Sequence, residues 1–248
     1  MRLKVIACEV LFRELSLIAS RSGRTVDFEW LPKGLHDLGG AAMRERLQGV
    51  IDATDAAGYE ALALGYGLCN NGLVGLNARS VPLVLPRAHD CITAFLGSRE
   101  RYARYFASHP GTYFRTTGWL ERGEAAGGAF GLPTQVGGLS LDRDAMVAKY
   151  GEDNARYLTE ELGDLARHYR RLAFIRMGLA VDDAFEARAR DEARRRGWEY
   201  EPLQGDLALL ERLVEGPWDD REFLIVPPGR RTVATHDERI LAIEEAQP

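Results

Sequence analysis

The sequence predicts an α/β protein made of two similar Rossmann-like lobes, in which parallel sheets are covered by helices and a cleft separates the lobes. Short apolar runs bounded by Gly, Pro and Asp alternate with stretches of helical periodicity along the chain. The same β-α-β-α-β order occurs in both halves. Right-handed crossovers would turn each half into a small parallel sheet covered by helices. A single continuous sheet is the alternative arrangement.

The composition is that of an ordinary globular protein. The chain has 248 residues, of which 46% are hydrophobic and 28% are charged, which excludes disordered and fibrous proteins. At roughly 150 residues per domain, this length predicts one or two domains. The net charge of −5 argues against a nucleic-acid partner. No stretch approaches the roughly 18 apolar residues that span a bilayer, so no membrane association is expected.

The N-terminal residues and the number of cysteines indicate the cellular compartment of the protein. The chain starts with an apolar run that is interrupted by Lys4 and ends at Glu9, unlike a secretory signal peptide. Three cysteines in such a chain are expected to be free thiols in a reducing environment. We therefore expect a cytoplasmic protein without disulfides.

The first part of the chain, residues 1–122, is expected to form the N-terminal lobe. Its elements follow from the alternation of short apolar runs and amphipathic stretches. The expected strands lie near residues 3–8, 26–31, 61–66, 81–86 and 112–116, and the expected helices near 10–20, 40–56 and 91–107. Cys91 begins the last of these helices, whose apolar side includes Phe95 and Phe106.

A Gly-rich connection over 123–141 leads to the second lobe, residues 142–248. Residues 123–138 have little periodicity and are interpreted as a loop, with a lid as an alternative. A charged helical segment is expected from about 142 to 172. The strands of this lobe are expected near 172–178, 198–203 and 223–229, and its other helices near 182–196 and 206–213.

The three cysteines lie at the carboxyl ends of predicted strands. Cys8 ends the first strand, Cys69 follows the third and Cys91 follows the fourth. Ligands of open α/β sheets bind outside the carboxyl ends of the strands. We therefore expect the three thiols to share one edge of a single sheet, which is the strongest functional signal in the sequence.

Three thiolates with His89 nearby would form a tetrahedral site for a borderline-soft cation, and zinc is the expected metal. Iron, or an iron–sulfur cluster with a non-Cys ligand, is the alternative. The wide spacing of Cys8, Cys69 and Cys91 favours a substrate-binding site with an open position over a compact zinc finger. His89 is the expected ligand or acid/base, and Glu9 is a second candidate acid/base. Metal-free reactive thiols, or cysteines that only pack at strand ends, are the other interpretations.

Polar residues of the same edge could bind a cofactor or the anionic part of a substrate. Asn70 and Gly72 belong to a Gly-rich turn whose backbone N–H groups could cradle an anion. Arg87 follows the fourth strand and could bind a carboxylate or phosphate. The turn lacks the third glycine of a dinucleotide fingerprint and no Walker motif occurs, so nucleotide binding has weak support.

Several long strings of residues carry a resemblance to a known family. They are CEVLFRE at 8–14, LGYGLCNNG at 64–72, PRAHDCIT at 86–93, FLGSRE at 95–100, PGTY at 110–113 and VPPG at 226–229. Together they resemble a bacterial and archaeal family that is catalogued only as domain of unknown function 1638. The resemblance covers about residues 3–230.

The resemblance implies a context and no activity. Members of the family often accompany corrinoid proteins and methyltransferases of one-carbon metabolism, so the implied partner is one of these, and corrinoid would reach this chain only through that partner. Zinc enzymes that methylate thiols from methyl-corrinoid proteins use a His-x-Cys pair and a distant Cys. The resemblance is one of ligand types, since His89 and Cys91 with Cys8 or Cys69 offer the same set.

We therefore expect a zinc-binding protein that acts on a small-molecule substrate, with methyl or thiol transfer as the first choice of reaction. Whether the chain is an enzyme, such as a metal-dependent transferase, stays open from the sequence. One alternative is a non-catalytic accessory protein that holds a metal or corrinoid for a partner methyltransferase. The other is a metal-free binder that closes on a carboxylate through Arg87 and the turn at 67–72.

Overall fold

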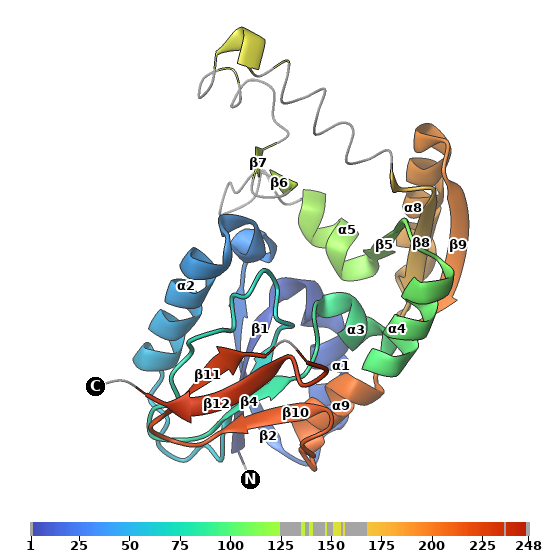
Figure 1. Ribbon diagram of the computed structural model, residues 1–248. Helices are drawn as coiled ribbons and strands as arrows, with labels where there is room; N and C mark the ends of the chain where they lie inside the picture. Colours follow the sequence, from blue (N-terminus) through green and yellow to red (C-terminus); the bar gives the residue numbers. More distant parts are fainter. Residues whose placement is uncertain are drawn as a thin grey trace. The chain divides into compact units, whose positions relative to one another are not determined.

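The fold comes from a computed structural model, which describes residues 2–124, 135–136, 139–140, 147, 151–154, 156, 168–235 and 237–246. The chain forms two compact units (Figure 1). The first comprises Met1–Arg104 and Gly205–Pro248, and the second comprises Tyr105–Gln204. This division differs from the expected boundaries at 122 and 142, because the last part of the chain returns to the first unit.

The first unit is built on a five-stranded sheet with the order β10-β4-β3-β1-β2. The strands are β1 (Arg2–Cys8), β2 (Thr25–Leu31), β3 (Leu62–Gly65), β4 (Leu83–Pro86) and β10 (Phe223–Val226). The first four run parallel, and β10 pairs antiparallel with β4. All residues of β3 and β4 are buried, as expected for central strands covered on both faces.

The order of these strands reverses beside β1. The chain passes from β1 to β2 on one side, and then returns to place β3 on the other side of β1. The crevice at the carboxyl ends of β1 and β3 is therefore a topological switch point, where open α/β sheets bind their ligands.

Helices of the first unit cover both faces of the sheet. They are η1 (Glu9–Leu11), α1 (Phe12–Arg21), η2 (Lys33–Leu38), α2 (Gly40–Ala53), α3 (Cys91–Leu96), α4 (Arg99–Ser108) and α9 (Ala208–Glu215), and α4 continues into the second unit. Helix α9 packs against α1, α3, β3 and β4, and Figure 1 shows α2 on the opposite side of the sheet. Met43, Leu47 and Ile51 recur every four residues and form the buried side of α2.

The helix expected over 91–107 is divided into α3 and α4 at Gly97, so this expectation was wrong. Gly97 ends α3 in the left-handed conformation, with a φ of 79°. A Cβ atom at Gly97 would lie 2.6 Å from the Cβ atom of Asp206. Both the turn and the close packing require glycine. The apolar residues expected along one helix therefore divide between α3, which is mostly buried, and α4, which has no buried residue.

The second unit contains a smaller parallel sheet with the order β5-β8-β9. Its elements are β5 (Thr112–Thr116), α5 (Thr117–Glu124), β6 (Gln135–Val136), β7 (Leu139–Ser140), β8 (Arg171–Arg176), α8 (Asp182–Arg196) and β9 (Glu199–Gln204). Leu172 and Phe174 of β8 pack against Ala189 and Ala193 of α8. Each large side chain buried in this way contributes about 1.5–3 kcal/mol.

The strand expected at 223–229 forms β10, which joins the first sheet instead of the second. Phe223 pairs with Pro86 and Val226 pairs with Leu83, so this apolar run completes the sheet of the first unit. A hairpin that the sequence did not reveal, β11 (Arg230–Ala234) and β12 (Leu241–Glu245), follows it. The α/β class with parallel, helix-covered sheets is confirmed, but the two sheets differ in size and strand direction.

Two expectations fall largely on residues that the structure does not describe. They are the loop at 123–138, with its alternative as a lid, and the helix expected from 142 to 172.

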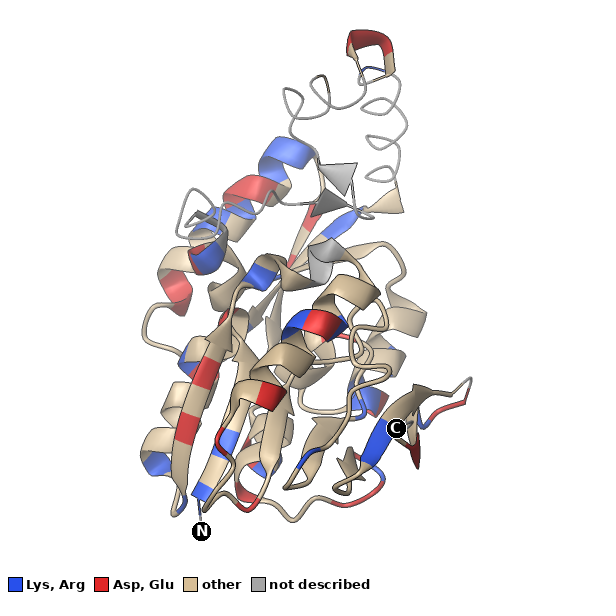
Figure 2. Cartoon of the chain, turned by 90° about the vertical axis from the view of Figure 1, so that its left-hand side faces the viewer, with Lys and Arg blue, Asp and Glu red and all other residues tan. Residues whose placement is uncertain are grey.

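Within the described ranges, no helix is long and apolar enough to cross a membrane. In Figure 2, charges of both signs are interspersed along helices and strands. Pairs such as Arg115 with Glu192 at 2.9 Å account for some of this pattern.

Candidate functional site

The three cysteines lie at the carboxyl ends of three neighbouring parallel strands. Cys8 is the last residue of β1, Cys69 lies four residues beyond the end of β3, and Cys91 begins α3 after β4. The Cys8 thiol interacts electrostatically with both Cys91 and Cys69. None of these three cysteines forms a disulfide; Cys8 is buried and the other two are partly exposed. Their side chains therefore gather at the switch point of the first sheet.

Burial keeps two of these thiols protonated at neutral pH. It raises the pKa of Cys8 to about 12, and the negative charges of Cys91 and Glu9 act in the same direction. Burial also raises the pKa of Cys69 to about 12. One backbone N–H opposes burial at each thiol, from Val10 at Cys8 and from Gly67 at Cys69. Without a group that favours the thiolate, these two cysteines are poor nucleophiles.

The turn that carries Cys69 has an unusual backbone. Cys69, Asn70 and Asn71 are consecutive residues with φ values of 41°, 56° and 63°. Each non-glycine residue in this left-handed region costs about 1–2 kcal/mol. The Cys69 N–H donates to the carbonyl of His89 at 3.0 Å, which helps to hold the turn. Strain of this kind concentrates at functional sites, so the turn supports the choice of this edge.

Close packing joins this turn to the start of α3. A Cβ atom at Gly67 would lie 2.6 Å from the Cα atom of Asp90. The side chain of Asn70 is exposed, whereas Gly72 is buried against Met43 and donates its N–H to the Cys69 carbonyl at 3.1 Å. The Gly72 N–H therefore serves the turn itself, and the anion-binding role expected of it finds no support in this contact.

Tyr66 is the residue at this edge that the sequence analysis missed. It follows β3 directly, is only 6% exposed, and its hydroxyl has no hydrogen-bond partner in the part of the chain that the structure describes. Burial raises the pKa of Tyr66, and negative charge on Cys8, Cys69 or Glu9 raises it further. The hydroxyl is therefore close enough to these groups to be influenced by their charge. Its position between Gly65 and Gly67, just after a central strand, is the sequence signal that could have indicated it.

The two expected acid/base residues occupy different environments. Glu9 accepts a hydrogen bond from the Lys33 backbone N–H on its Oε1 atom at 2.9 Å, and both charges act on Cys8. His89 has an exposed side chain beside Asp90. Glu9 thus borders the thiols, whereas His89 lies at the surface.

Asp90 caps α3. Its carboxylate accepts hydrogen bonds from the Ile92 N–H at 3.0 Å and from the Tyr102 hydroxyl at 3.1 Å. Burial raises the pKa of Asp90, while the hydrogen bonds from Tyr102 and the backbone oppose that rise. Asp90 is therefore the N-cap of α3.

The described side chains at this edge are not arranged around a cation. Among the described residues, no three His, Cys, Asp or Glu side chains form a group that could hold a metal ion as they stand. Three thiols and a phenol hydroxyl without a partner are nevertheless the groups that zinc and its outer hydrogen bonds use. The expected set of Cys8, Cys69 and Cys91 shares the edge, with His89 pointing to solvent.

Arg87, expected to bind an anionic ligand, is instead an internal anchor. Its side chain is 4% exposed and donates to the carbonyl oxygens of Asp220, Arg239 and Leu241 at 2.7, 2.7 and 2.5 Å. It also donates to the Asp220 carboxylate at 2.6 Å. These contacts tie the end of β4 to the C-terminal hairpin, so no support remains for a role of Arg87 in ligand binding.

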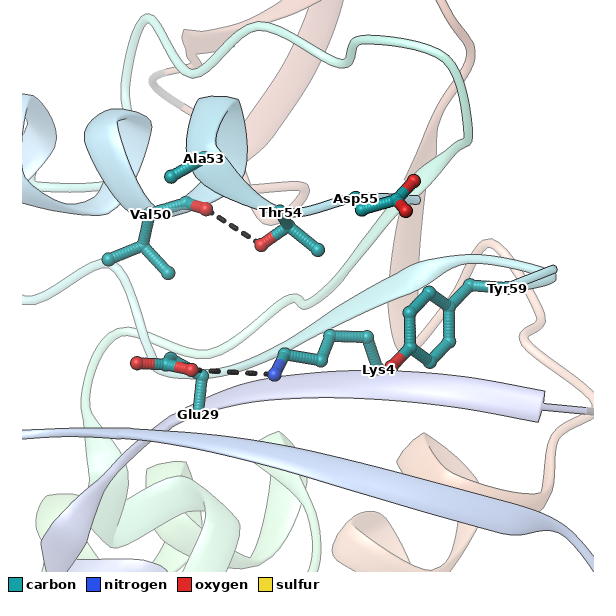
Figure 3. Close-up of a pocket in the computed structure, with 7 residues that line it drawn as sticks. All are labelled: Lys4, Glu29, Val50, Ala53, Thr54, Asp55 and Tyr59. Carbon is teal, nitrogen blue, oxygen red and sulfur yellow. Dashed lines mark hydrogen bonds and ion pairs between the residues drawn. The ribbon is translucent and has the colours of Figure 1, made fainter. Parts of the chain in front are cut away.

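A cavity of about 320 Å³ lies elsewhere on the first unit, between β1, β2 and the C-terminal end of α2. Figure 3 shows Lys4 and Glu29 on one side of it, with Nζ and Oε2 3.4 Å apart, and Thr54 and Asp55 on the other. None of the expected site residues lines this cavity. It does not adjoin the cysteines, so the switch point remains the candidate site.

Comparisons with known proteins give a family and no activity. A family model described as "Protein of unknown function (DUF1638)" matches residues 30–214. Neither the curated proteins nor the solved structures contain a match to the chain.

Proposed function

The chain belongs to the DUF1638 family, and on that premise we propose that its three cysteines form a zinc site at which a small-molecule substrate is bound and transformed. The single observation that carries the proposal is the gathering of Cys8, Cys69 and Cys91 at the switch point of the first sheet. The family description names no reaction, so we infer the reaction from the chemistry of these residues.

The raised pKa values of the thiols argue against a metal-free nucleophile. A thiol with a pKa of about 12, as at Cys8 and Cys69, is almost entirely protonated at neutral pH. A coordinated metal ion deprotonates a thiol outright. Thiolate ligands select zinc and other soft cations among the common biological metals. Iron or an iron–sulfur cluster stays the alternative occupant of the same ligands.

Closing the site requires side-chain movement at two of the three ligands. Cys8 is fixed at the end of β1, whereas Cys69 and Cys91 are partly exposed, on a turn and at the first residue of a helix. Rotation of these two side chains toward Cys8 would complete three ligands. The fourth position would then be left to His89 or to the substrate.

Zinc held by thiolates supplies a Lewis acid and keeps a coordinated thiolate nucleophilic, which is the chemistry needed for methyl or thiol transfer. In this proposal Glu9, beside Cys8, accepts or returns a proton during the reaction. His89, whose side chain is exposed, would act in the same way from the solvent side of the site. A corrinoid protein or methyltransferase is the proposed partner. If the chain is not itself an enzyme, its proposed role is to deliver zinc or corrinoid to that partner.

The test is metal analysis of protein purified without oxygen, beside the Cys91→Ser variant. We expect close to one equivalent of zinc per chain in the wild type and its loss in the variant. Matching circular dichroism spectra would establish that the variant is folded. If zinc and iron are absent from the wild type, and reconstitution with either also fails, the proposal is wrong.

A metal-free small-molecule binder is the second candidate, because the described side chains do not surround a metal as they stand. In that case the exposed Asn70 and Asn71, together with Lys33, would contact an anionic ligand at the same edge. The two candidates differ in one simple respect. Chelators would abolish ligand binding by the zinc protein and leave binding by the metal-free protein unchanged.

A further inference from the structure

The cavity between β1, β2 and the C-terminal end of α2 is large enough to hold a small molecule. Its volume of about 320 Å³ lies at the lower end of the range of roughly 300–1,000 Å³ that small-molecule sites occupy. Figure 3 shows Lys4 and Glu29 on the side of the strands, with Val50, Ala53 and Asp55 on the side of α2. All of the lining residues belong to the first unit.

The ammonium group of Lys4 is poorly satisfied by its own chain. The side chain is only 14% exposed, and Nζ donates to the Phe28 carbonyl and to Glu29 Oε2, each at 3.4 Å. Both distances exceed the usual range of about 2.7–3.2 Å. An ammonium group has three N–H donors, and within the described residues these two are its only hydrogen-bond acceptors. A mostly buried charge with such weak contacts gains from a closer acceptor in the cavity.

Negative charge is in excess around this ammonium group. Glu29 is half exposed and has only the long contact with Lys4 among the described residues. Asp55 accepts a hydrogen bond from the Ala57 N–H on Oδ1 at 3.1 Å, which leaves Oδ2 to the cavity. Helix α2 ends at Ala53 without a basic residue in its last turn, so its C-terminal end adds partial negative charge. The cavity therefore combines one positive group with several negative ones.

We propose that this cavity binds a small zwitterion of the α-amino-acid class, whose carboxylate accepts a hydrogen bond from Lys4 and whose ammonium group donates to Glu29 and Asp55. The charges of Lys4 and Glu29 are opposite and 3.4 Å apart, and an α-amino acid carries its own opposite charges on adjacent carbon atoms. The ligand would replace one long ion pair with shorter, charge-assisted hydrogen bonds. An anion alone would face the two carboxylates, and a cation alone would face the lysine.

The rest of the lining limits the side chain of the ligand. Val50 and Ala53 present apolar groups beside the charges, which favours a short apolar side chain such as that of alanine or valine. Tyr59 is a fixed wall, because its hydroxyl donates to Asp27 Oδ2 at 2.9 Å and the Arg2 guanidinium lies 4.6 Å from the centre of its ring. None of these residues belongs to the cysteine edge, so the site is independent of the proposed function.

The test is isothermal titration calorimetry of the full chain near neutral pH with L-alanine and L-valine. Isovalerate and L-valinamide are the matched probes, since each keeps the carbon skeleton of valine and lacks one of its two charges. We expect both to bind roughly 10–100-fold more weakly than valine, because each loses a hydrogen bond between charged groups.

Two variants test the assigned residues. Lys4→Met keeps most of the side-chain length and removes the ammonium group, and Glu29→Gln keeps the size and removes the charge; each should weaken valine binding at least about tenfold. Arg79→Met and Glu60→Gln are the controls, because they change the same charges outside the cavity. Arg79 is paired with Asp52 near the end of α2 at 2.6 Å. Both controls should bind valine as the wild type does.

Three results would each overturn the inference. They are no binding of alanine or valine at about 10 mM, isovalerate binding as tightly as valine, and unchanged valine affinity in Lys4→Met or Glu29→Gln. Circular dichroism establishes that each variant is folded, and Glu29→Gln decides the matter if Lys4→Met is not. Each of these results leaves the zinc proposal unchanged, because the cavity does not adjoin the cysteines.

Discussion

Zinc binding should release protons, and the number released follows from the raised pKa values of Cys8 and Cys69. The experiment is a zinc titration of the metal-free, reduced protein, carried out at different pH values. Cys8 and Cys69 both have pKa values of about 12, so both must lose a proton when they bind zinc near neutral pH. At least two protons per zinc should therefore appear in solution.

The magnitude can be worked from the same values. One pKa unit corresponds to about 1.4 kcal/mol, so ionising Cys8 at pH 7 costs about 7 kcal/mol, which zinc coordination must offset. Each released proton makes the apparent affinity rise about tenfold per pH unit. Two thiols thus predict a rise of about a hundredfold per pH unit, and ionisation of Cys91 would add to it.

The assay combines two measurements. A pH indicator in weakly buffered solution counts protons released per zinc, and competition with a chromophoric chelator gives the affinity at two pH values one unit apart. The Cys69→Ser variant is the internal comparison and should release one proton fewer. An affinity that is independent of pH, or release of less than one proton per zinc, would refute coordination by the buried thiols.

The remaining predictions concern the reactivity of the thiols, the pH dependence of stability, and the residues Arg87 and His89. In the metal-free protein, Cys8 and Cys69 should react slowly with iodoacetamide near neutral pH and about tenfold faster per pH unit toward their pKa values; peptide mapping that finds either thiol labelled as fast as an unfolded control would contradict this. Because the folded pKa of Cys8 lies above the unfolded value of about 8.5, the free energy of unfolding should fall as pH rises from about 8.5, which urea titrations can measure. Arg87→Met should destabilise the protein by about 3 kcal/mol or more, since three carbonyl oxygens lose their donor; a change in urea denaturation below about 1 kcal/mol would be inconsistent with the anchor. His89→Ala should lower zinc affinity less than about tenfold, because the His89 side chain is exposed. The control variant His109→Ala should have a similarly small effect. Loss of zinc comparable to that in Cys91→Ser would show that His89 turns inward as a ligand.

The sequence was sufficient to predict the four parallel strands of the first sheet and the position of the cysteines at their carboxyl ends. The segments ending at Cys8, preceding Cys69 and preceding Cys91 are short apolar runs bounded by turn residues, and parallel pairing then brings their carboxyl ends together. The pattern of apolar residues and the rule that parallel strands end at the same edge are sufficient for that inference, and no side-chain contact needs to be known.

The features that escaped prediction depend on contacts between distant segments. The run at 223–226 is apolar in either sheet, and only its pairing with β4 decides which sheet it joins. Gly97 divides a continuous apolar pattern because Asp206 packs against it. Arg87 looks like a ligand-binding residue until the C-terminal hairpin, which the sequence did not reveal, supplies its acceptors.

Tyr66 was missed for a related reason. An aromatic residue after a buried strand is usually part of the core, and nothing in the local sequence states whether its hydroxyl has an acceptor. That property depends on two separate segments, one with Cys8 and Glu9 and the other with Cys69. Sequence reasoning found the thiols because their residue type is rare, and it overlooked the buried hydroxyl that their charge influences.

X-ray absorption at the zinc edge tests most directly whether Cys8, Cys69 and Cys91 form a metal site. Protein reconstituted with one equivalent of zinc should give three sulfur neighbours at about 2.3 Å and one nitrogen or oxygen neighbour at about 2.0 Å. Cys91→Ser should lose one sulfur neighbour and replace it with a lighter atom. A zinc shell made only of nitrogen and oxygen would show that zinc binds elsewhere, and would contradict a thiolate site at the switch point.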